Sequence, residues 1–176
     1  YPDPHQKALK EQIAAIKGIA AENIFIGNGS DEAIDMVFRV FCEPRVDNVV
    51  AIAPSYGMYK VAAAINDVEI REVQLGEEFS LPVEELLAAT DANTKAIFLC
   101  SPNNPTGNSF PRDEVMRLVE EFEGMVVVDE AYIDFAEAES LRCEIASHPN
   151  LIILQTMSKA WAMAGLRVGL ALADRR

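Results

Sequence analysis

The chain has 176 residues, of which 50% are hydrophobic and 24% are charged, the balance of an ordinary globular domain with a sizeable core. Its 28 acidic residues outnumber its 15 basic residues, so the formal net charge is −13. That excess of acid argues against a nucleic-acid partner, because a phosphate backbone is bound by clustered Lys and Arg. No apolar run approaches the roughly 20 residues that a membrane-spanning helix needs, so we expect no membrane partner either.

Cysteine and histidine are too few and too scattered for a disulfide framework or a metal site. The three cysteines show no CxxC spacing, and the two histidines, His5 and His148, lie far apart in the sequence. This cysteine usage favours a reducing compartment and hence the cytoplasm. The chain has no initiator Met and ends directly after an apolar segment, so we expect it to be part of a longer protein.

The hydrophobic pattern alternates between helical and strand-like periods along the chain. A first helix is predicted after Pro4, because Leu9, Ile13 and Ile16 recur at the spacing of one helix face. A short strand at residues 24–26 follows, and then a helix with an apolar stripe over residues 34–41. Further strands are predicted at residues 49–53, 68–73, 96–100, 125–129, 151–155 and 168–173, and helices between them at residues 56–65, 83–89 and 113–122.

Several of these strands are apolar at consecutive positions, which is typical of strands covered on both faces. We therefore predict one α/β domain with a mostly parallel central sheet and helices on both faces. In such sheets, ligands bind at the carboxyl ends of the strands. Polar groups follow five of the predicted strands and should converge on that edge, at residues 27–32, 54–57, 101–107, 129–132 and 156–159.

Two of these segments each allow two interpretations. Residues 27–32 lead from a strand into a helix, so their backbone N–H groups can hold a phosphate; alternatively, they form a plain turn in which Ser30 or Asp31 caps the helix. Residues 101–107 are either a bare turn or a turn that presents an asparagine to a bound ring. The isomers of the peptide bonds before Pro102 and Pro105 stay open.

The segments that follow two buried strands carry ionisable groups. Asp129 ends a strongly apolar strand, where it either pairs with a protonated pyridine nitrogen or turns outward as a cap. Tyr132 either returns toward the same ring or packs as an ordinary aromatic side chain. Lys159 is either a solvated surface amine or, partly desolvated near Arg167, the nucleophile that forms a Schiff base. Arg167 either binds the phosphate or pairs with an acid.

A phosphate cradle, a ring-nitrogen acid, hydrogen-bonding and stacking side chains and an amine together describe a pyridoxal phosphate site. The motifs that carry this chemistry resemble those of the fold-type I, class I/II aminotransferases in order and spacing: Asn104-Pro105-Thr106-Gly107, Asp129-x-x-Tyr132, and Ser158-Lys159 followed by Arg167. More narrowly, the chain resembles the histidinol-phosphate aminotransferases at residues 1–4, 27–32, 56–59, 101–107, 128–132 and 155–161.

This resemblance implies a role for each matching residue around the cofactor ring. Lys159 would form the Schiff base with pyridoxal 5′-phosphate and carry the proton, and Asp129 would pair with the ring nitrogen. Asn104 and Tyr132 would hydrogen-bond the ring hydroxyl, while Tyr56 would stack on the ring.

The resemblance also implies how the phosphate is held. Backbone N–H groups, two hydroxyls and a guanidinium would bind it, supplied by Ser30, Asp31, Thr156, Ser158 and Arg167. Tyr1 would reach the cofactor phosphate of the other subunit, which implies a homodimer.

The implied reaction moves an amino group between two small molecules, L-histidinol phosphate and 2-oxoglutarate, in histidine biosynthesis. Family members are about twice as long, so residues 1–176 would be their cofactor-binding large domain without the small domain whose arginine grips the substrate. Three alternatives stay open. They are a related decarboxylase that acts on an amino-acid phosphate, a truncated domain that binds the cofactor without turnover, and a scaffold or dimerisation unit that binds no cofactor.

Overall fold

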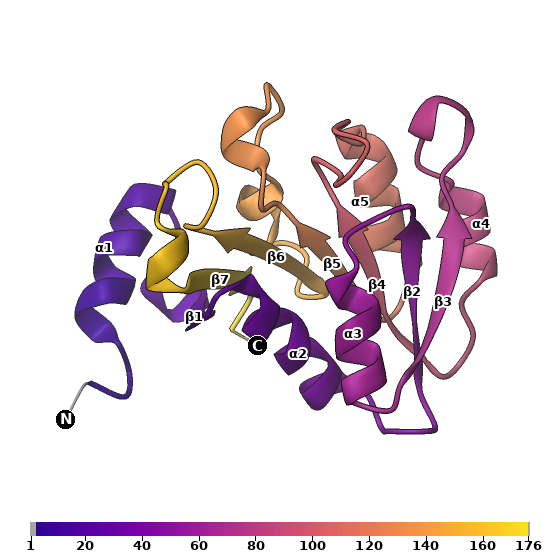
Figure 1. Ribbon diagram of the computed structural model, residues 1–176, viewed down its shortest axis with the longest axis horizontal. Helices are drawn as coiled ribbons and strands as arrows, with labels where there is room; N and C mark the ends of the chain where they lie inside the picture. Colours follow the sequence, from indigo (N-terminus) through magenta and orange to yellow (C-terminus); the bar gives the residue numbers. More distant parts are fainter. Residues whose placement is uncertain (1–2, 176) are drawn as a thin grey trace.

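The computed structural model describes residues 3–175, and a single seven-stranded sheet forms its centre (Figure 1). The strand order is β1-β7-β6-β5-β4-β2-β3. The strands span β1 Ile24–Asn28, β2 Asn48–Ala53, β3 Glu69–Gln74, β4 Thr94–Cys100, β5 Met125–Asp129, β6 Leu151–Thr156 and β7 Val168–Ala173. β7 runs antiparallel to both of its neighbours, and the remaining pairs are parallel, so the prediction of a mostly parallel sheet is confirmed.

Five α-helices cover the two faces of the sheet. They are α1 Lys7–Lys17, α2 Ser30–Phe41, α3 Met58–Ile65, α4 Val83–Ala88 and α5 Arg112–Glu121. α2 and α3 pack on one face, and α4 and α5 pack on the other, where Ile13 of α1 joins the same apolar cluster (Figure 1). The predicted elements are all present, and their ends differ by at most two residues. One of the two-residue differences is at α3, which begins at Met58 and leaves Tyr56 in the preceding loop.

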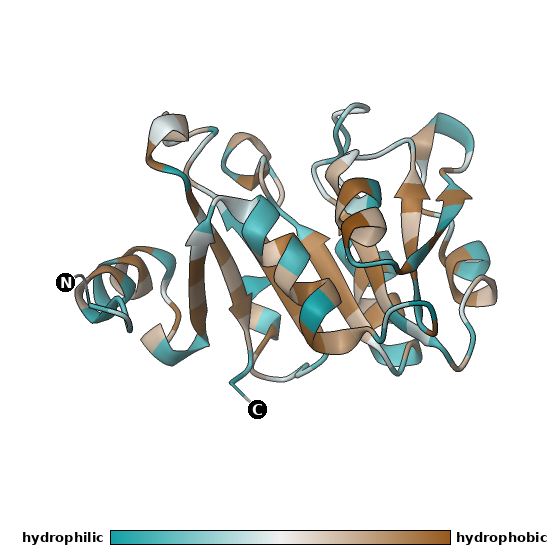
Figure 2. Cartoon of the chain, turned by 60° about the horizontal axis from the view of Figure 1, so that its bottom comes forward, coloured by the Kyte–Doolittle hydropathy of each residue, from teal (hydrophilic) through white to brown (hydrophobic). Residues whose placement is uncertain are grey.

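Burial of the strands explains why they are apolar at consecutive positions. All residues of β2 and β6 are buried, because helices lie over both faces of the sheet centre. Each helix instead has a buried face and an exposed face. In α2, Ile34 and Phe38 are fully buried, whereas Arg39 is exposed. Figure 2 shows this division, with hydrophobic strands beneath helices whose outer faces are hydrophilic. Each fully buried side chain of this size stabilises the fold by about 1.5–3 kcal/mol before conformational entropy is counted.

The parallel strands bring their following loops to one edge of the sheet. The segments after β4, β5 and β6 emerge there together (Figure 1). Because β1 is antiparallel to β7, and β7 to β6, β1 points the same way as β6 and delivers the start of α2 to that edge. None of the helices in residues 3–175 is both long and apolar enough to cross a bilayer.

Candidate active site

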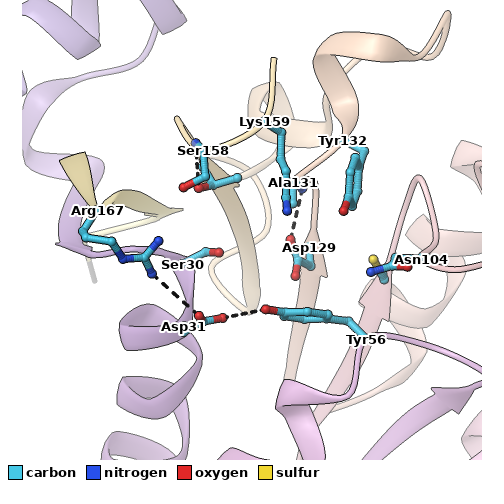
Figure 3. Close-up of a pocket in the computed structure, with 12 residues that line it drawn as sticks. Ser30, Asp31, Tyr56, Asn104, Asp129, Ala131, Tyr132, Ser158, Lys159 and Arg167 are labelled. Carbon is cyan, nitrogen blue, oxygen red and sulfur yellow. Dashed lines mark hydrogen bonds and ion pairs between the residues drawn. The ribbon is translucent and has the colours of Figure 1, made fainter. Parts of the chain in front are cut away.

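A pocket at this edge gathers ten of the eleven residues that the sequence singled out (Figure 3). Cys100 and Ala131 complete its lining. The eleventh, Tyr1, lies outside the described residues. The gathered residues come from the start of α2, from the last residues of β5 and β6, and from the loops after β2, β4, β5 and β6, so five segments that are remote in sequence form one site.

Two glycines allow the start of α2 and the start of β7 to approach each other closely. Gly29 precedes α2 with φ 82°, a left-handed conformation that favours glycine, and its N–H donates to the Arg167 carbonyl oxygen over 2.8 Å. A Cβ atom at Gly169 would lie 2.0 Å from the Ser30 backbone nitrogen. This close passage places the Arg167 side chain beside the amino end of α2.

The amino end of α2 is suited to an anion. Gly29 is its N-cap and no side-chain oxygen caps it, so the alternative in which Ser30 or Asp31 caps the helix is wrong. First-turn N–H groups have no partner within a helix, and the helix dipole adds positive potential there. The hydroxyls of Thr156 and Ser158 and the Arg167 guanidinium line the same end of the pocket.

The Asp31 carboxylate is held by two side chains of the pocket. Tyr56 donates its hydroxyl proton to Asp31 Oδ1 over 3.0 Å, and Arg167 Nη2 lies 3.8 Å from Asp31 Oδ2 (Figure 3). Arg167 therefore has the acidic partner that the sequence left as an alternative, although it also lines the anion-binding end. The distance of 3.8 Å and the half-exposed side chains make this a weak ion pair.

Asp129 is buried at the end of β5, with 2% of its surface exposed, and lines the pocket rather than turning outward. Tyr59 donates a 3.0 Å hydrogen bond to its Oδ2, and the Ala131 N–H donates one of 3.0 Å to its Oδ1. Burial raises the pKa of Asp129 to about 6, while these two hydrogen bonds oppose that rise. At neutral pH the pocket thus contains a buried carboxylate that a cationic ligand group would stabilise.

The loop after β4 gives its two asparagines different roles. Asn103 is buried and holds the loop: its Nδ2 donates to the Pro54 carbonyl oxygen over 3.0 Å and to Thr106 Oγ1 over 2.7 Å. Asn104 instead lines the pocket, so the loop is more than a bare turn. The peptide bonds before Pro102 and Pro105 are both cis.

Lys159 and Tyr132 lie side by side on the upper wall of the pocket, and the lysine side chain extends toward Asp129 (Figure 3). The Lys159 Nζ atom is 5.4 Å from the centre of the Tyr132 ring. Of the two alternatives that the sequence left open for Lys159, the partly desolvated amine is not seen, because its side chain is exposed although it lines the pocket.

A second cluster supports the Lys159 loop from outside the pocket. Trp161 donates its indole N–H to Asp134 Oδ2 over 3.0 Å. Lys17 of α1 lies 3.8 Å from Asp134 Oδ1 and 5.4 Å from the Trp161 ring centre. Burial lowers the pKa of Lys17. We refer to Lys17, Asp134 and Trp161 as the loop clasp.

Sequence reasoning missed Tyr59, Asn103, the buried Glu130 and two members of the loop clasp, Lys17 and Asp134. Glu130 accepts hydrogen bonds from the Ser140 hydroxyl, the Leu141 N–H and Gln155 Nε2. Most of these contacts join residues far apart in the sequence, so no local pattern could reveal them. The sequence offered one signal here, an acid at the end of a buried strand. That signal identified Asp129 but not its neighbour Glu130.

Comparison with known proteins agrees with this geometry. The family model described as aminotransferase class I and II matches residues 1–176. The histidinol-phosphate aminotransferase of Bacteroides thetaiotaomicron is 58% identical over 174 residues, which are 99% of this chain and 50% of that relative. The chain therefore spans about half the length of the curated relatives it matches.

Two solved structures show the same fold. The histidinol-phosphate aminotransferase of Sinorhizobium meliloti, in complex with pyridoxal-5′-phosphate, matches 99% of this chain and 48% of its own with a TM-score of 0.91 and 28% identity. The L-threonine-O-3-phosphate decarboxylase of Porphyromonas gingivalis matches 99% of this chain and 54% of its own with a TM-score of 0.84 and 25% identity. On the match over residues 1–176, the chain belongs to the class I and II aminotransferase family.

Proposed function

We propose that the protein transfers an amino group between L-histidinol phosphate and 2-oxoglutarate with pyridoxal 5′-phosphate bound in this pocket. Residues 1–176 are then the cofactor-binding large domain. The observation that carries the proposal is the convergence of Lys159, Asp129 and the amino end of α2 on one pocket. Family membership and the 58% identity to a histidinol-phosphate aminotransferase support it further.

The chemistry of the pocket fits each functional group of this cofactor. The phosphate needs an anion site, which the first turn of α2, Arg167, Thr156 and Ser158 supply. The ring nitrogen, when protonated, needs a buried carboxylate, and Asp129 is 2% exposed. The aldehyde needs an amine, and Lys159 extends into the same pocket (Figure 3).

In the proposed mechanism, the chain binds, orients and moves protons. When bound, pyridoxal phosphate supplies an aldehyde for covalent attachment and a ring that withdraws electrons from the substrate. Asp129 keeps a proton on the ring nitrogen, since the buried carboxylate favours a cation beside it. Asn104 and Tyr132 orient the ring hydroxyl, and Tyr56 packs against the ring.

Lys159 moves the proton of the reaction. Its amine would hold the aldehyde of the cofactor and, when free, would be the base that takes the proton from the substrate Cα and returns it on the cofactor side of the transferred nitrogen. Arg167 and the two hydroxyls fix the phosphate throughout, so the ring keeps its place while the lysine moves.

The likeness to the threonine-phosphate decarboxylase favours keeping that reaction as a second candidate. Both reactions would use the same cofactor-binding residues, and they differ in whether the substrate Cα loses a proton or a carboxylate. Turnover distinguishes them. The complete protein that carries this chain is incubated with pyridoxal phosphate and L-histidinol phosphate, with and without 2-oxoglutarate, or with L-threonine O-3-phosphate.

We expect 2-oxoglutarate to be converted to glutamate when histidinol phosphate supplies the amino group, and no conversion to occur in Lys159→Ala. Release of CO2 from threonine phosphate without glutamate formation would instead establish the decarboxylase. Cofactor binding without either product would favour the alternative of a cofactor-binding domain without turnover. The absence of cofactor binding would favour the alternative of a scaffold or dimerisation unit.

We further propose a homodimer in the cytoplasm, with Tyr1 of one subunit reaching the cofactor phosphate of the other. The dimer is proposed from the resemblance to the family, and the cytoplasmic location is proposed from the cysteine usage. Sedimentation equilibrium of the complete protein tests the dimer: a monomer at micromolar concentration contradicts it.

A further inference from the structure

Tyr59 of α3 contacts the buried acid of the pocket from below. Only 1% of its surface is exposed, and its hydroxyl donates to Asp129 Oδ2 over 3.0 Å. Its ring stacks on Phe98 with centres 5.2 Å apart and meets Tyr56 edge-on at 5.8 Å. The two aromatic neighbours fix the ring plane, so the hydroxyl has a defined direction toward the carboxylate.

A phenylalanine would fill this apolar position as well as a tyrosine does, because the Tyr59 ring packs among the aromatic and apolar side chains of one core cluster. A buried hydroxyl is costly unless it is hydrogen-bonded. The Tyr59 hydroxyl donates to Asp129 Oδ2 and also hydrogen-bonds the Cys100 thiol beside it. The hydroxyl therefore stabilises the Asp129 carboxylate, whereas the packing of the core depends on the ring alone.

Burial and two neighbouring acids oppose the negative charge of Asp129. Burial raises the pKa of Asp129 most strongly, and Asp31 on α2 and Glu130, the residue after β5, raise it further. The Cys100 thiol on β4, with Tyr132 and Lys159 from the loops, completes the polar and ionisable surroundings in the pocket. Against these, the Tyr59 hydroxyl and the Ala131 N–H are the two hydrogen-bond donors that favour the ionised carboxylate.

We propose that Tyr59 is a positioning residue whose hydroxyl keeps the Asp129 carboxylate ionised and aimed into the pocket. Of the two donors, the Ala131 N–H belongs to the backbone of the same turn and is present for any residue there. The Tyr59 hydroxyl, in contrast, is a side-chain donor, so a substitution at residue 59 can remove it. Its value to catalysis rests on the proposed function, in which Asp129 holds a proton on the ring nitrogen of the cofactor.

Burial and the neighbouring Asp129 charge raise the pKa of the Tyr59 phenol well above its ordinary value. The phenol therefore stays protonated, and stays a donor, over the whole range in which Asp129 titrates. Because the hydrogen bond stabilises the charged form of the acid, its removal must raise the pKa of Asp129. The direction of this change does not depend on any bound cofactor.

The test is a titration of the Asp129 carboxyl carbon by NMR in the cofactor-free complete protein. Wild type should titrate near pH 6. We expect Tyr59→Phe to move the midpoint upward by about one pH unit, the size of a single charge-assisted hydrogen bond. Phe98→Leu is the matched control, because it loosens the same aromatic stack but leaves the hydroxyl in place.

An unchanged midpoint in Tyr59→Phe, or an equal rise in Phe98→Leu, overturns the proposal. Should Tyr59→Phe fail to fold, the wild-type protein still decides. The ring carbon that carries the Tyr59 hydroxyl should show an inflection at the pH where Asp129 titrates, and its absence is a contradiction.

The two proposals fail differently. If Lys159 binds no pyridoxal phosphate, the proposed function fails while the carboxyl titration still stands. If the cofactor binds and Tyr59→Phe leaves the midpoint of the Asp129 titration unchanged, only the proposed role of Tyr59 fails.

Discussion

The Trp161 indole donates a 3.0 Å hydrogen bond to Asp134 and thereby joins two loops of the pocket. Trp161 lies two residues after Lys159, and Asp134 lies two residues after Tyr132. The buried Lys17 contacts both residues of this pair. The loop clasp therefore sets the relative position of the two loops that carry the proposed reacting amine and the ring-orienting tyrosine.

Trp161→Phe should loosen this connection without emptying the space that the ring fills. It removes one hydrogen bond to a carboxylate, which costs about 1–3 kcal/mol of unfolding free energy. We expect the dissociation constant for pyridoxal phosphate to rise several-fold, because the Lys159 loop becomes more mobile. Titration with the cofactor, followed by the visible absorbance of the bound form, measures this. Arg117→Gln, which breaks an exposed ion pair with Glu121, is the control, and an equal effect in both variants contradicts a role for the loop clasp.

Gly169→Ala should displace the first turn of α2. The added Cβ would lie 2.0 Å from the Ser30 nitrogen and 2.1 Å from the Gly29 carbonyl carbon, and neither backbone atom can rotate away. Overpacking of this kind costs about 1–3 kcal/mol or more, and we expect the affinity for pyridoxal phosphate to fall at least about tenfold. Urea unfolding and cofactor titration measure the two effects. Gly165→Ala, whose Cβ would contact nothing within 4 Å, should change neither.

Arg167→Ala should chiefly weaken retention of the cofactor. The guanidinium lies at the anion-binding end of the pocket, and its ion pair with Asp31 is long and half-exposed, so little folding stability depends on it. We expect inorganic phosphate to compete with the cofactor in wild type and much less in this variant. Arg39→Ala, an exposed arginine further along α2, serves as the control. Unchanged cofactor affinity in Arg167→Ala would mean that the side chain does not bind the phosphate.

The stability of the cofactor-free protein should depend on pH through Asp129. Its pKa is raised to about 6 in the folded state from an ordinary value of 3.8, so the folded state binds the proton more tightly. Stability from this group is present below pH 4 and is lost as the pH rises to about 6. The loss corresponds to about 3 kcal/mol. Asp129→Asn should lack it, so the stability of the variant relative to wild type should rise between pH 4 and pH 7 in urea unfolding.

The same variant should behave oppositely in the reaction. Asp129→Asn keeps the shape of the side chain but removes the charge that holds a proton on the ring nitrogen. Covalent attachment of the cofactor to Lys159 should persist, whereas the amino-transfer half-reaction in stopped-flow absorbance should slow by two or more orders of magnitude. Wild-type rates in this variant would remove Asp129 from the proposed role.

The sequence predicted the pocket well because most of the pocket residues follow strands directly. Parallel strands bring their ends to one edge, so Asn104, Asp129 and Lys159 could be placed together without knowledge of any contact. The bond between Tyr59 and Asp129 spans 70 residues, and the one between Trp161 and Asp134 spans 27. Such pairs depend on how α3 and the loops pack in three dimensions. The sequence could not decide between an exposed and a partly desolvated Lys159 for the same reason, since solvation depends on every wall of the pocket.

Reduction of the pyridoxal phosphate-treated protein with borohydride, followed by peptide mass spectrometry, tests most directly whether Lys159 is the residue that binds the cofactor in this pocket. We predict stoichiometric modification of Lys159, strong competition by phosphate, and no stoichiometric modification of any lysine in Lys159→Ala. Modification spread over surface lysines, with Lys159 unmodified, would contradict the proposed site.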